Sequence, residues 1–262
     1  MSKLTQDERL KGILEHMKEH GKIRLEQICE MYQVSRDSAR RDLVRLEEAR
    51  LIARTHGGAI LPSLGIATIP YEERIHNVDA KQRIGRAAAC LVQDGETLFV
   101  DASTTVQAAV EAFSAKDITT VTNSIDAATL LGKKQNGKVH LLGGEYNPWH
   151  RNVTGPQTLA MIRDYRVQTL LLGACAITSD GLSSPLVEEA YVKREMVARA
   201  DRVIVLADQG KFQKSFLHHV CGVENIHVLI TDAEPPAMVK ELLAKHRIEI
   251  IIANEGEHEH DN

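Results

Sequence analysis

Four arginines stand near the N-terminus at the spacing of a single helix, at Arg36, Arg40, Arg41 and Arg45. A guanidinium group can hold a phosphate, or the O6 and N7 edge of guanine, through two parallel hydrogen bonds. Such a helix is therefore suited to entering the major groove of DNA. Acidic residues lie among the arginines, and mixed charge is equally typical of a solvated helix face with ion pairs. The arginines alone leave both interpretations open.

The elements around this arginine helix favour DNA binding. Ser35 is a suitable N-cap, because its side-chain oxygen can accept a hydrogen bond from the first helical turn. Apolar residues at helical spacing predict a helix over residues 6–20 and a second, shorter one that ends before Val34. Behind the third helix, Gly57 and Gly58 are flanked by residues typical of strands and predict a hairpin. Three short helices and a hairpin form a winged helix-turn-helix.

A second group of candidate residues consists of small hydroxyl side chains, Ser103, Thr104 and Thr105, which follow Asp101 and an apolar segment. At a helix N-terminus, hydroxyl groups add donors to the free backbone N–H groups and to the positive end of the helix dipole, and such an arrangement suits a phosphate group. Ordinary N-capping explains the same residues and stays open as an alternative. Asn123 follows the next apolar segment in the same way.

The other candidates for ligand binding are glycines and charged residues at or near predicted strand ends. Adjacent glycines let a ligand approach the backbone closely. A carboxylate and an amine four residues apart can serve a ligand, but a surface ion pair within one helix explains them as well. These candidates are Gly143, Gly144, Glu189, Lys193, Asp208 and Lys211.

After residue 75, apolar segments of strand length alternate along the sequence with segments of helical periodicity. This alternation predicts a mainly parallel sheet covered on both faces, whose ligands bind at the carboxyl ends of the strands. The expected strands are 97–101, 118–122, 139–142, 169–173, 203–207, 228–231 and 249–252. The expected helices are 81–92, 106–113, 125–133, 158–165, 188–200 and 237–246.

Length and composition agree with two unequal globular domains. In the 262-residue chain, residues 1–60 have 12 basic and 10 acidic residues, and the remainder has 20 and 26, which gives +2 and −6. A small basic lobe suits a sequence-specific DNA binder better than a protein that coats nucleic acid. We expect a DNA-binding domain over 1–60, a linker over 61–74, an α/β domain over 75–254 and a disordered tail over 255–262.

The sequence also makes several classes of protein unlikely. It has no apolar run long enough for a membrane span and no signal peptide, so we expect a cytoplasmic protein without membrane contact. The four cysteines are scattered, which favours small buried side chains over disulfides or zinc ligands. G-x-G-x-x-G and G-x-x-x-x-G-K-[ST] are both absent, so neither a dinucleotide nor a nucleoside triphosphate is expected. We expect no cofactor and no metal ion.

The segments Ser35-x-x-Ser38-Ala39-Arg40-Arg41-Asp42-Leu43 and Arg54-Thr55-His56-Gly57-Gly58-Ala59, together with Arg9, resemble the DeoR family of bacterial sugar-metabolism repressors. The resemblance covers about residues 6–253. It implies an α+β winged helix-turn-helix joined to an α/β sensor domain similar to ribose-5-phosphate isomerase. Asp42 is expected to orient an arginine rather than to read a base. The residues expected to bind DNA are Ser35, Arg36, Ser38, Arg40, Arg41, Arg45, Arg54, His56 and Gly57.

The resemblance further implies that the effector is a phosphorylated sugar. It places the phosphate at Ser103, Thr104 and Thr105, and further contacts at Asp101, Asn123, Gly143, Gly144, Glu189, Lys193, Asp208 and Lys211. The expected function is a ligand-controlled transcriptional regulator, most simply a repressor, that binds operator DNA as a homo-oligomer, either a dimer or a tetramer. The alternative is an enzyme similar to a sugar-phosphate isomerase, in which the same carboxylates and lysines act as acid, base and enediolate-stabilising groups.

Overall fold

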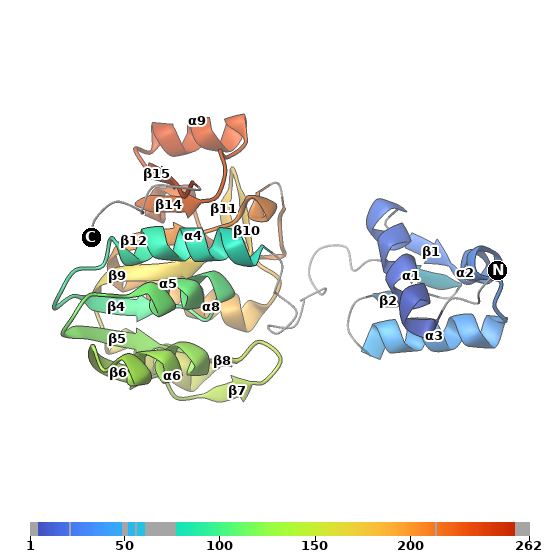
Figure 1. The fold of residues 1–262 in the computed structure, drawn as a ribbon, viewed down its shortest axis with the longest axis horizontal. Helices are drawn as coiled ribbons and strands as arrows, with labels where there is room; N and C mark the ends of the chain where they lie inside the picture. The colour runs from blue at the N-terminus through green and yellow to red at the C-terminus, as the bar shows by residue number, and fades with distance from the viewer. Residues whose placement is uncertain are drawn as a thin grey trace. The chain divides into compact units, whose positions relative to one another are not determined.

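The structure is a computed structural model that describes residues 5–20, 22–48, 52–55, 57–60, 77–212 and 214–254. Its contacts divide the chain into two compact units, Met1–Ile69 and Pro70–Asn262 (Figure 1). The predicted linker, 61–74, and the predicted tail, 255–262, lie outside the described residues. The two units are described separately.

The N-terminal unit contains the three predicted helices and a small antiparallel sheet. The helices are α1 (Gln6–His20), α2 (Leu25–Tyr32) and α3 (Arg36–Glu48). The strands are β1 (Lys22–Arg24), β2 (Ala53–Thr55) and β3 (Gly58–Ile60), in the order β1-β3-β2. Strands β2 and β3 form the predicted hairpin, and this arrangement confirms the winged helix-turn-helix. Strand β1 was not predicted.

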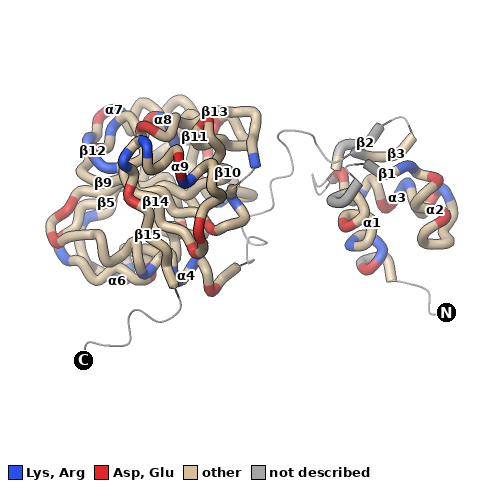
Figure 2. The backbone as a smooth tube through the Cα atoms, turned by 90° about the horizontal axis from the view of Figure 1, so that it is seen from above, with Lys and Arg blue, Asp and Glu red and all other residues tan. Residues whose placement is uncertain are grey.

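Apolar side chains from all three helices meet in one core. Ile13 of α1, Ile28 of α2 and Leu43 of α3 are each at most 3% exposed. Gly58 starts β3 beside β1, and only glycine fits there, because a Cβ atom would lie 2.1 Å from the carbonyl oxygen of Ile23. Charged residues of both signs alternate along the three helices (Figure 2). Packing therefore fixes α3 against its neighbours by its apolar side and leaves its charged side exposed.

The larger unit is built on a seven-stranded sheet in which every neighbouring pair of strands is parallel. The strand order is β15-β14-β12-β9-β4-β5-β6. The strands are β4 (Thr97–Val100), β5 (Ile118–Thr122), β6 (Gly137–Leu141), β9 (Val167–Gly173), β12 (Ala200–Leu206), β14 (Val228–Thr231) and β15 (Glu249–Ile252).

Helices cover this sheet on both faces (Figure 1), as the alternation of helices and strands predicts. Within β4, Leu98 and Val100 belong to one apolar core and Phe99 to the other. Residues of α4, α5 and α6 pack into the first core, and residues of α7, α8 and α9 pack into the second. The helices are α4 (Val78–Ala89), α5 (Thr104–Ala112), α6 (Ile125–Lys134), α7 (Pro156–Arg163), α8 (Val187–Ala198) and α9 (Ala237–Lys245).

Several short elements were not predicted. One is an antiparallel sheet of β10 (Ala176–Thr178), β11 (Gly181–Ser184) and β13 (His218–Cys221); the other is the pair β7 (Glu145–Asn147) and β8 (Asn152–Thr154). There are also two short 3₁₀ turns, η2 (Gln209–Lys211) and η3 (Val223–Asn225). Three residues are too few to show a strand period in a sequence, and the four-residue strands β11 and β13 contain glycine, serine or histidine residues that interrupt an apolar run.

Some predicted element ends were wrong. Helix α4 covers Val78–Ala89 rather than 81–92, and β12 begins at Ala200, which was predicted to end a helix. Helix α8 ends at Ala198, and the carbonyl oxygen of Arg199 accepts a hydrogen bond from the backbone of Val167 at 3.0 Å. Pairing with β9 therefore determines where β12 starts, and pairing between distant segments is not visible in a local pattern.

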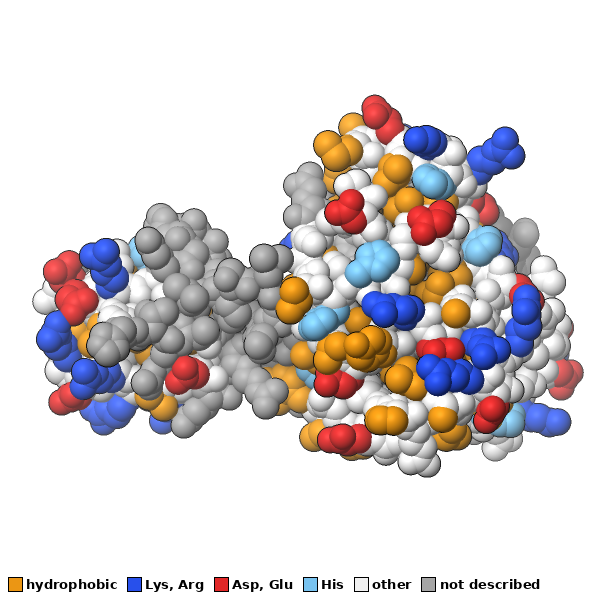
Figure 3. Space-filling model, turned by 180° about the vertical axis from the view of Figure 1, so that it is seen from behind, with side chains coloured by type: hydrophobic (Ala, Val, Ile, Leu, Met, Phe, Trp, Pro, Cys, Tyr) orange, Lys and Arg blue, Asp and Glu red, His pale blue; other side chains and the backbone are white. Residues whose placement is uncertain are grey.

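The surface of the larger unit is mixed in character. On the face seen in Figure 3, basic, acidic and apolar side chains lie beside one another. Among the described residues, no helix has the length and apolarity that crossing a membrane requires.

Candidate functional site

Helix α3 begins at the predicted cap. The Ser35 hydroxyl accepts a hydrogen bond from the backbone N–H of Ser38 at 3.3 Å and donates to the Ser38 hydroxyl at 3.1 Å. Ala39, Leu43 and Leu46 are buried, so the helix packs by the face that the sequence indicates. Its orientation is thus set by a polar contact at its start and by apolar contacts along its length.

Asp42 is a charged residue of this helix whose side chain is nevertheless fully buried. Its two oxygens accept from Nε of Arg9 at 2.5 Å and from a terminal nitrogen of Arg9 at 3.0 Å. The Gln6 amide donates to Asp42 at 2.9 Å. The hydrogen bond that Arg9 donates to the Asp42 carboxylate raises the pKa of the Arg9 guanidinium. The prediction that Asp42 orients an arginine is confirmed, and the arginine comes from α1.

The four arginines of α3 differ in their partners. Arg36 forms an ion pair with Glu26 of α2, which offsets its charge. Arg41 donates to the Asp37 carbonyl oxygen at 3.3 Å, and Arg45 donates to a side-chain amide oxygen at 2.6 Å. Arg40 is exposed. Within the described part of the chain, none of Arg40, Arg41 and Arg45 has a carboxylate partner, so three positive charges of α3 remain uncompensated.

The wing is held to α2 through its turn. The carbonyl oxygen of Gly57 accepts from the backbone of Leu25 at 2.9 Å. Gly57 lies in the turn, while Gly58 already belongs to β3. The backbone of Arg54 pairs with Ala59 across the hairpin. His56 lies outside the described residues.

In the larger unit, most predicted ligand residues lie at one edge of the sheet. The chain proceeds from β4 to β5 and β6 in one direction, whereas β9, β12, β14 and β15 extend in the other. The strand order therefore reverses between β4 and β9, and parallel sheets bind ligands at the carboxyl ends of strands beside such a point. Asp101 follows β4 there, and Gly173 ends β9.

Asp101 and Lys193 connect these two strand ends. The Lys193 ammonium forms an ion pair with an Asp101 carboxylate oxygen and also donates to the Gly173 carbonyl oxygen at 2.9 Å. The Gly173 N–H donates to the same Asp101 oxygen at 3.1 Å. Burial acts to lower the pKa of Lys193, but the negative charges of Asp101 and its neighbours outweigh it and raise that pKa. Lys193 therefore stays protonated.

Glu189 lies one helical turn before Lys193, yet the two do not form the surface pair that their spacing allows. Both are buried. Glu189 accepts from the Asn152 amide at 3.1 Å and from the Ser184 hydroxyl at 3.3 Å, and the ring nitrogen Nδ1 of His150 lies 3.6 Å from it. The surface ion pair considered as an alternative is therefore wrong, and α8 presents both charges to the strand ends.

Asn123 joins this group from the end of β5. Its side-chain amide donates to the Val153 carbonyl oxygen at 3.2 Å, and its backbone oxygen accepts from Val153 at 2.8 Å. The side-chain oxygens of Asn123 and Asn152 are both buried and have no hydrogen-bond partner. A buried acceptor without a donor is costly, and such an atom calls for an explanation.

The hydroxyl residues form the N-terminus of α5. Ser103 is the N-cap and accepts from the backbone of Thr105 at 3.3 Å, which confirms the capping interpretation without excluding a ligand. A Cβ atom at Gly173 would lie 2.2 Å from the side chain of Ser103, so glycine lets β9 approach this helix end closely. Thr104 is half-buried.

The remaining predicted residues lie at the flanks of the same edge. The Gly143 carbonyl oxygen accepts from Thr158 at 2.9 Å, and Gly144 has φ +145° with Thr158 close by. Asp208 caps η2 by accepting from Gly210 at 2.9 Å. In the described regions Asp208 and Lys211 form no ion pair with each other, and no hydrogen bond joins either to Lys193.

Sequence reasoning missed three groups of this site. Asn152, Ser184 and His150 contact Glu189, but they lie in or beside β8 and β11, which were not predicted. Their residue types carry no signal without the pairing of β8 to the end of β5, where Ser124 and Asn152 form an isolated bridge.

The cysteines follow the prediction only in part. Cys90 is exposed, so the expectation that each cysteine is buried is wrong there. Cys221 is buried in β13, and burial raises the pKa of its thiol to about 12. The described residues contain no group of three or more His, Cys, Asp or Glu side chains that could hold a metal ion.

Comparison with known proteins gives a consistent result for both units. Residues 9–64 match the family model described as the DeoR-like helix-turn-helix domain, and residues 76–233 match the DeoR C terminal sensor domain. The HTH-type transcriptional repressor GlcR of Bacillus subtilis is 40% identical over 255 residues, which cover 97% of this chain and 99% of that protein. The glycerol-3-phosphate regulon repressor of Escherichia coli is 32% identical, with 94% and 99% covered.

Among solved structures, the ribose 5-phosphate isomerase of Methanocaldococcus jannaschii matches with a TM-score of 0.38 and 16% identity, over 52% of this chain and 55% of that one. A likeness at this level says nothing about activity. The two sequence relatives match over nearly their whole length and nearly the whole length of this chain. The chain is therefore a member of the DeoR family, with an N-terminal helix-turn-helix domain and a C-terminal sensor domain.

Proposed function

We propose that this protein is a sequence-specific repressor of a carbohydrate catabolic operon and that a phosphorylated sugar controls it. In this proposal α3 enters the major groove and the wing contacts the flanking backbone. The DNA contacts come from the nine residues predicted for it, of which Arg40, Arg41 and Arg45 supply the uncompensated charge. The names of the relatives, a glycerol-3-phosphate regulon repressor among them, support this assignment.

The effector would bind at the strand edge of the larger unit. The free N–H groups and hydroxyls at the start of α5 suit a phosphate group. The carboxylates and amides of Glu189, Asn123 and Asn152 suit the hydroxyl groups of a sugar, because hydroxyls can both donate and accept.

The observation that carries this proposal is the pair of buried, unpartnered oxygens of Asn123 and Asn152. Both are acceptors, so their missing partners are donors, and a polyol supplies O–H donors on neighbouring carbon atoms. The dianionic phosphate ester of a sugar phosphate has acceptor oxygens only and would leave these two atoms unsatisfied, so the sugar hydroxyl groups must supply the donors. A ligand with both kinds of group fits the whole edge.

Control of DNA binding requires that the effector bind two states of the protein with different affinities. A homo-oligomer would place two recognition helices on repeated or palindromic half-sites, and the effector would change their relative placement. The alternative of an isomerase-like enzyme is not favoured for two reasons. The buried Asp101 carboxylate and the Lys193 ammonium already form an ion pair with each other. The two sequence relatives described above are named as repressors.

The DNA part is tested with a duplex that the wild-type protein selects from a random-sequence pool. Arg40→Ala should weaken binding of that duplex by roughly 1–3 kcal/mol if Arg40 contacts a base. Arg166→Ala is the matched control, because it removes an exposed arginine that pairs with Asp201 in the other unit. Undiminished, sequence-specific binding by the Arg40 variant would refute the assignment of α3.

The effector part is tested by thermal unfolding of the full chain with phosphorylated sugars, the same sugars without phosphate, and inorganic phosphate. A true effector at a hundred times its dissociation constant adds about 2.7 kcal/mol of stability. We expect this stabilisation only with a compound that has both hydroxyl and phosphate groups. Equal stabilisation by inorganic phosphate alone would contradict the role of the asparagine oxygens.

A further inference from the structure

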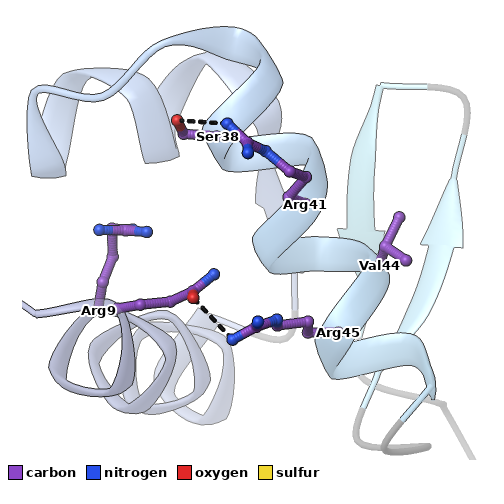
Figure 4. A pocket seen from close by; sticks show the side chains of 6 residues that line it. Arg9, Ser38, Arg41, Val44 and Arg45 are labelled. Atoms are coloured by element: carbon purple, nitrogen blue, oxygen red, sulfur yellow. Dashed lines mark hydrogen bonds between the residues drawn. The ribbon is translucent and has the colours of Figure 1, made fainter.

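A depression lies on the side of α3 that faces α1, next to the exposed face of the recognition helix. It has a volume of about 470 Å³ and is lined by Gln6, Arg9, Ser38, Arg41, Val44 and Arg45. In Figure 4, the Arg45 side chain extends toward α1, where it meets Gln6, and Arg41 reaches back to Ser38. We call this depression, with its six lining residues, the α1–α3 slot.

The charges around the α1–α3 slot do not cancel. Arg9 is paired with Asp42, so it contributes no net charge. Arg41 has the Asp37 carbonyl and the Ser38 hydroxyl as partners, and Arg45 has the Gln6 amide. All of these partners are neutral. Two full positive charges thus face one opening, which makes it a site for an anion.

The position of the slot indicates which anion. Roughly half to two-thirds of the hydrogen bonds between proteins and DNA go to phosphate oxygens and sugars, and arginine and serine side chains supply many of them. Arg41 and Arg45 are four residues apart and Ser38 precedes Arg41 by three, so all three side chains share one strip of α3. This strip borders α1 rather than the centre of the exposed face, so it suits the phosphate backbone better than a base edge at the centre of the groove.

A series of hydrogen bonds at the slot holds the side chain of Arg45 in place. Asp42 is buried and accepts two hydrogen bonds from the Arg9 guanidinium. The Gln6 amide donates to Asp42 at 2.9 Å, so its oxygen faces the other way and accepts from Arg45 at 2.6 Å. A chain of hydrogen bonds therefore connects Arg9, Asp42, Gln6 and Arg45. It fixes the orientation of the exposed Arg45 side chain relative to the buried Asp42. An arginine held before binding loses less side-chain freedom when it binds.

We propose that the α1–α3 slot takes one backbone phosphate of the operator, which Arg41, Arg45 and Ser38 hold. Gln6 acts as a positioning residue for Arg45. The proposal rests on the proposed DNA binding by α3 and adds the chemical group bound, its location and the source of its preorganisation. Neither Gln6 nor the slot was among the predicted DNA-binding features.

The test measures the affinity of the full chain for two duplexes as a function of salt concentration. One duplex is selected by the wild-type protein from a random pool, and the other is a scrambled version of it. Arg41→Ala and Arg45→Ala should each weaken binding of both duplexes roughly 10- to 100-fold. Each should also make the slope of log K against log salt less steep, by up to about 0.9, because each variant removes one of the two positive charges that neutralise the phosphate. Lys11→Ala, an exposed cation of α1 outside the slot, should change neither quantity as much.

The positioning role is tested by a double-mutant cycle. Gln6→Ala should weaken binding in the wild-type background but have no further effect in the Arg45→Ala background, because Gln6 then has nothing to orient. Thermal unfolding of each variant checks that the N-terminal unit is folded. Additive effects of the two substitutions would overturn the positioning role.

The phosphate assignment has its own refutation. An unchanged salt slope in both arginine variants, or a loss confined to the selected duplex, would overturn it and indicate base contacts instead. Failure of the wild-type protein to prefer any duplex would overturn the proposed function and, with it, the slot. Sequence-specific binding with an unaltered salt slope would overturn the slot alone.

Discussion

Replacing Asp101 by asparagine isolates the energetic role of the buried ion pair at the strand edge. The change keeps the size and shape of the side chain but removes its charge. Lys193 would remain buried, since its side chain is 7% exposed, and within the described part of the chain its remaining hydrogen-bond acceptor would be the Gly173 carbonyl oxygen at 2.9 Å. A buried cation without its counter-charge is strongly destabilising, and removing one partner of such a pair costs about 3–5 kcal/mol.

The effect of this loss on thermal unfolding is large. The unit that contains the pair extends over Pro70–Asn262. For domains of roughly this size, 1 kcal/mol shifts Tm by about 2–4 °C. The Asp101→Asn variant should therefore unfold about 6–20 °C below the wild type. Removing both charges with Asp101→Asn and Lys193→Met should restore most of the stability, because a buried pair can often be replaced by uncharged groups at little cost.

The dependence on pH gives an independent check. In the wild-type protein the pKa of Lys193 is raised, so the pair stabilises the fold fully below the ordinary value of 10.5 and this contribution is lost only as the pH rises through the higher folded value. In the Asp101→Asn variant we expect burial to dominate and to lower the pKa of Lys193. The stability deficit should then shrink between pH 7 and pH 9.

Differential scanning calorimetry of the wild type, the Asp101→Asn variant and the double variant at these two pH values measures all of these quantities. A single variant within 1 °C of the wild type would refute the reasoning, as would a double variant no more stable than Asp101→Asn. Asp101→Glu, which retains the charge but lengthens the side chain, is the control that separates charge from packing.

Two further predictions concern the cysteines and the DNA-binding core. Burial raises the pKa of the Cys221 thiol to about 12, so only about one part in ten thousand is thiolate at pH 8. Iodoacetamide should therefore label the exposed Cys90 in the native protein and Cys221 only after unfolding. Mass spectrometry of tryptic peptides measures both reactions. Leu43→Ala should lower the free energy of unfolding of the N-terminal unit by about 2–5 kcal/mol, which is enough to unfold this small unit. DNA binding should then be lost while effector binding persists. Circular dichroism together with DNA and effector titrations tests this, and retained DNA binding would contradict it.

Local patterns in the sequence were sufficient for the features that depend on neighbouring residues. The Ser35 cap, the buried side of α3 and the strand-helix alternation all follow from spacing over fewer than about fifteen residues. Asp42 could also be interpreted correctly, because a carboxylate that lies among arginines in the sequence is a natural partner for one of them. The sequence did not indicate that Asp42 is buried or that its partner is Arg9.

Contacts between distant segments could not be predicted in this way. Glu189 and Lys193 are four residues apart, and this spacing suggests a mutual pair, yet Lys193 pairs with Asp101, 92 residues away. Asn152 became a candidate only once β8 was placed beside the end of β5. A local pattern indicates which side of a helix is buried but not what it is buried against, and the chemistry of this site depends on the latter.

The charges at the strand edge determine which part of a phosphorylated sugar can lie where. Asp101, Glu189 and Lys193 together have a net charge of −1, which repels a phosphate dianion. The start of α5, with Ser103 as cap and Thr104 in the first turn, presents N–H groups and the positive end of the helix dipole. The phosphate should therefore lie at α5 and the hydroxyl groups at Glu189.

This orientation has a specific consequence for substitutions at Thr104. Thr104→Val keeps the shape of the side chain and removes its hydroxyl, so it should weaken binding of a phosphorylated sugar by roughly 0.5–3 kcal/mol. The same sugar without phosphate should bind much more weakly to the wild type, and the substitution should not change that weak affinity, because this compound makes no contact at Thr104. Isothermal titration calorimetry with both compounds measures the two effects. Equal losses for both would place the sugar hydroxyls at α5, and the charge argument for the orientation would then fail.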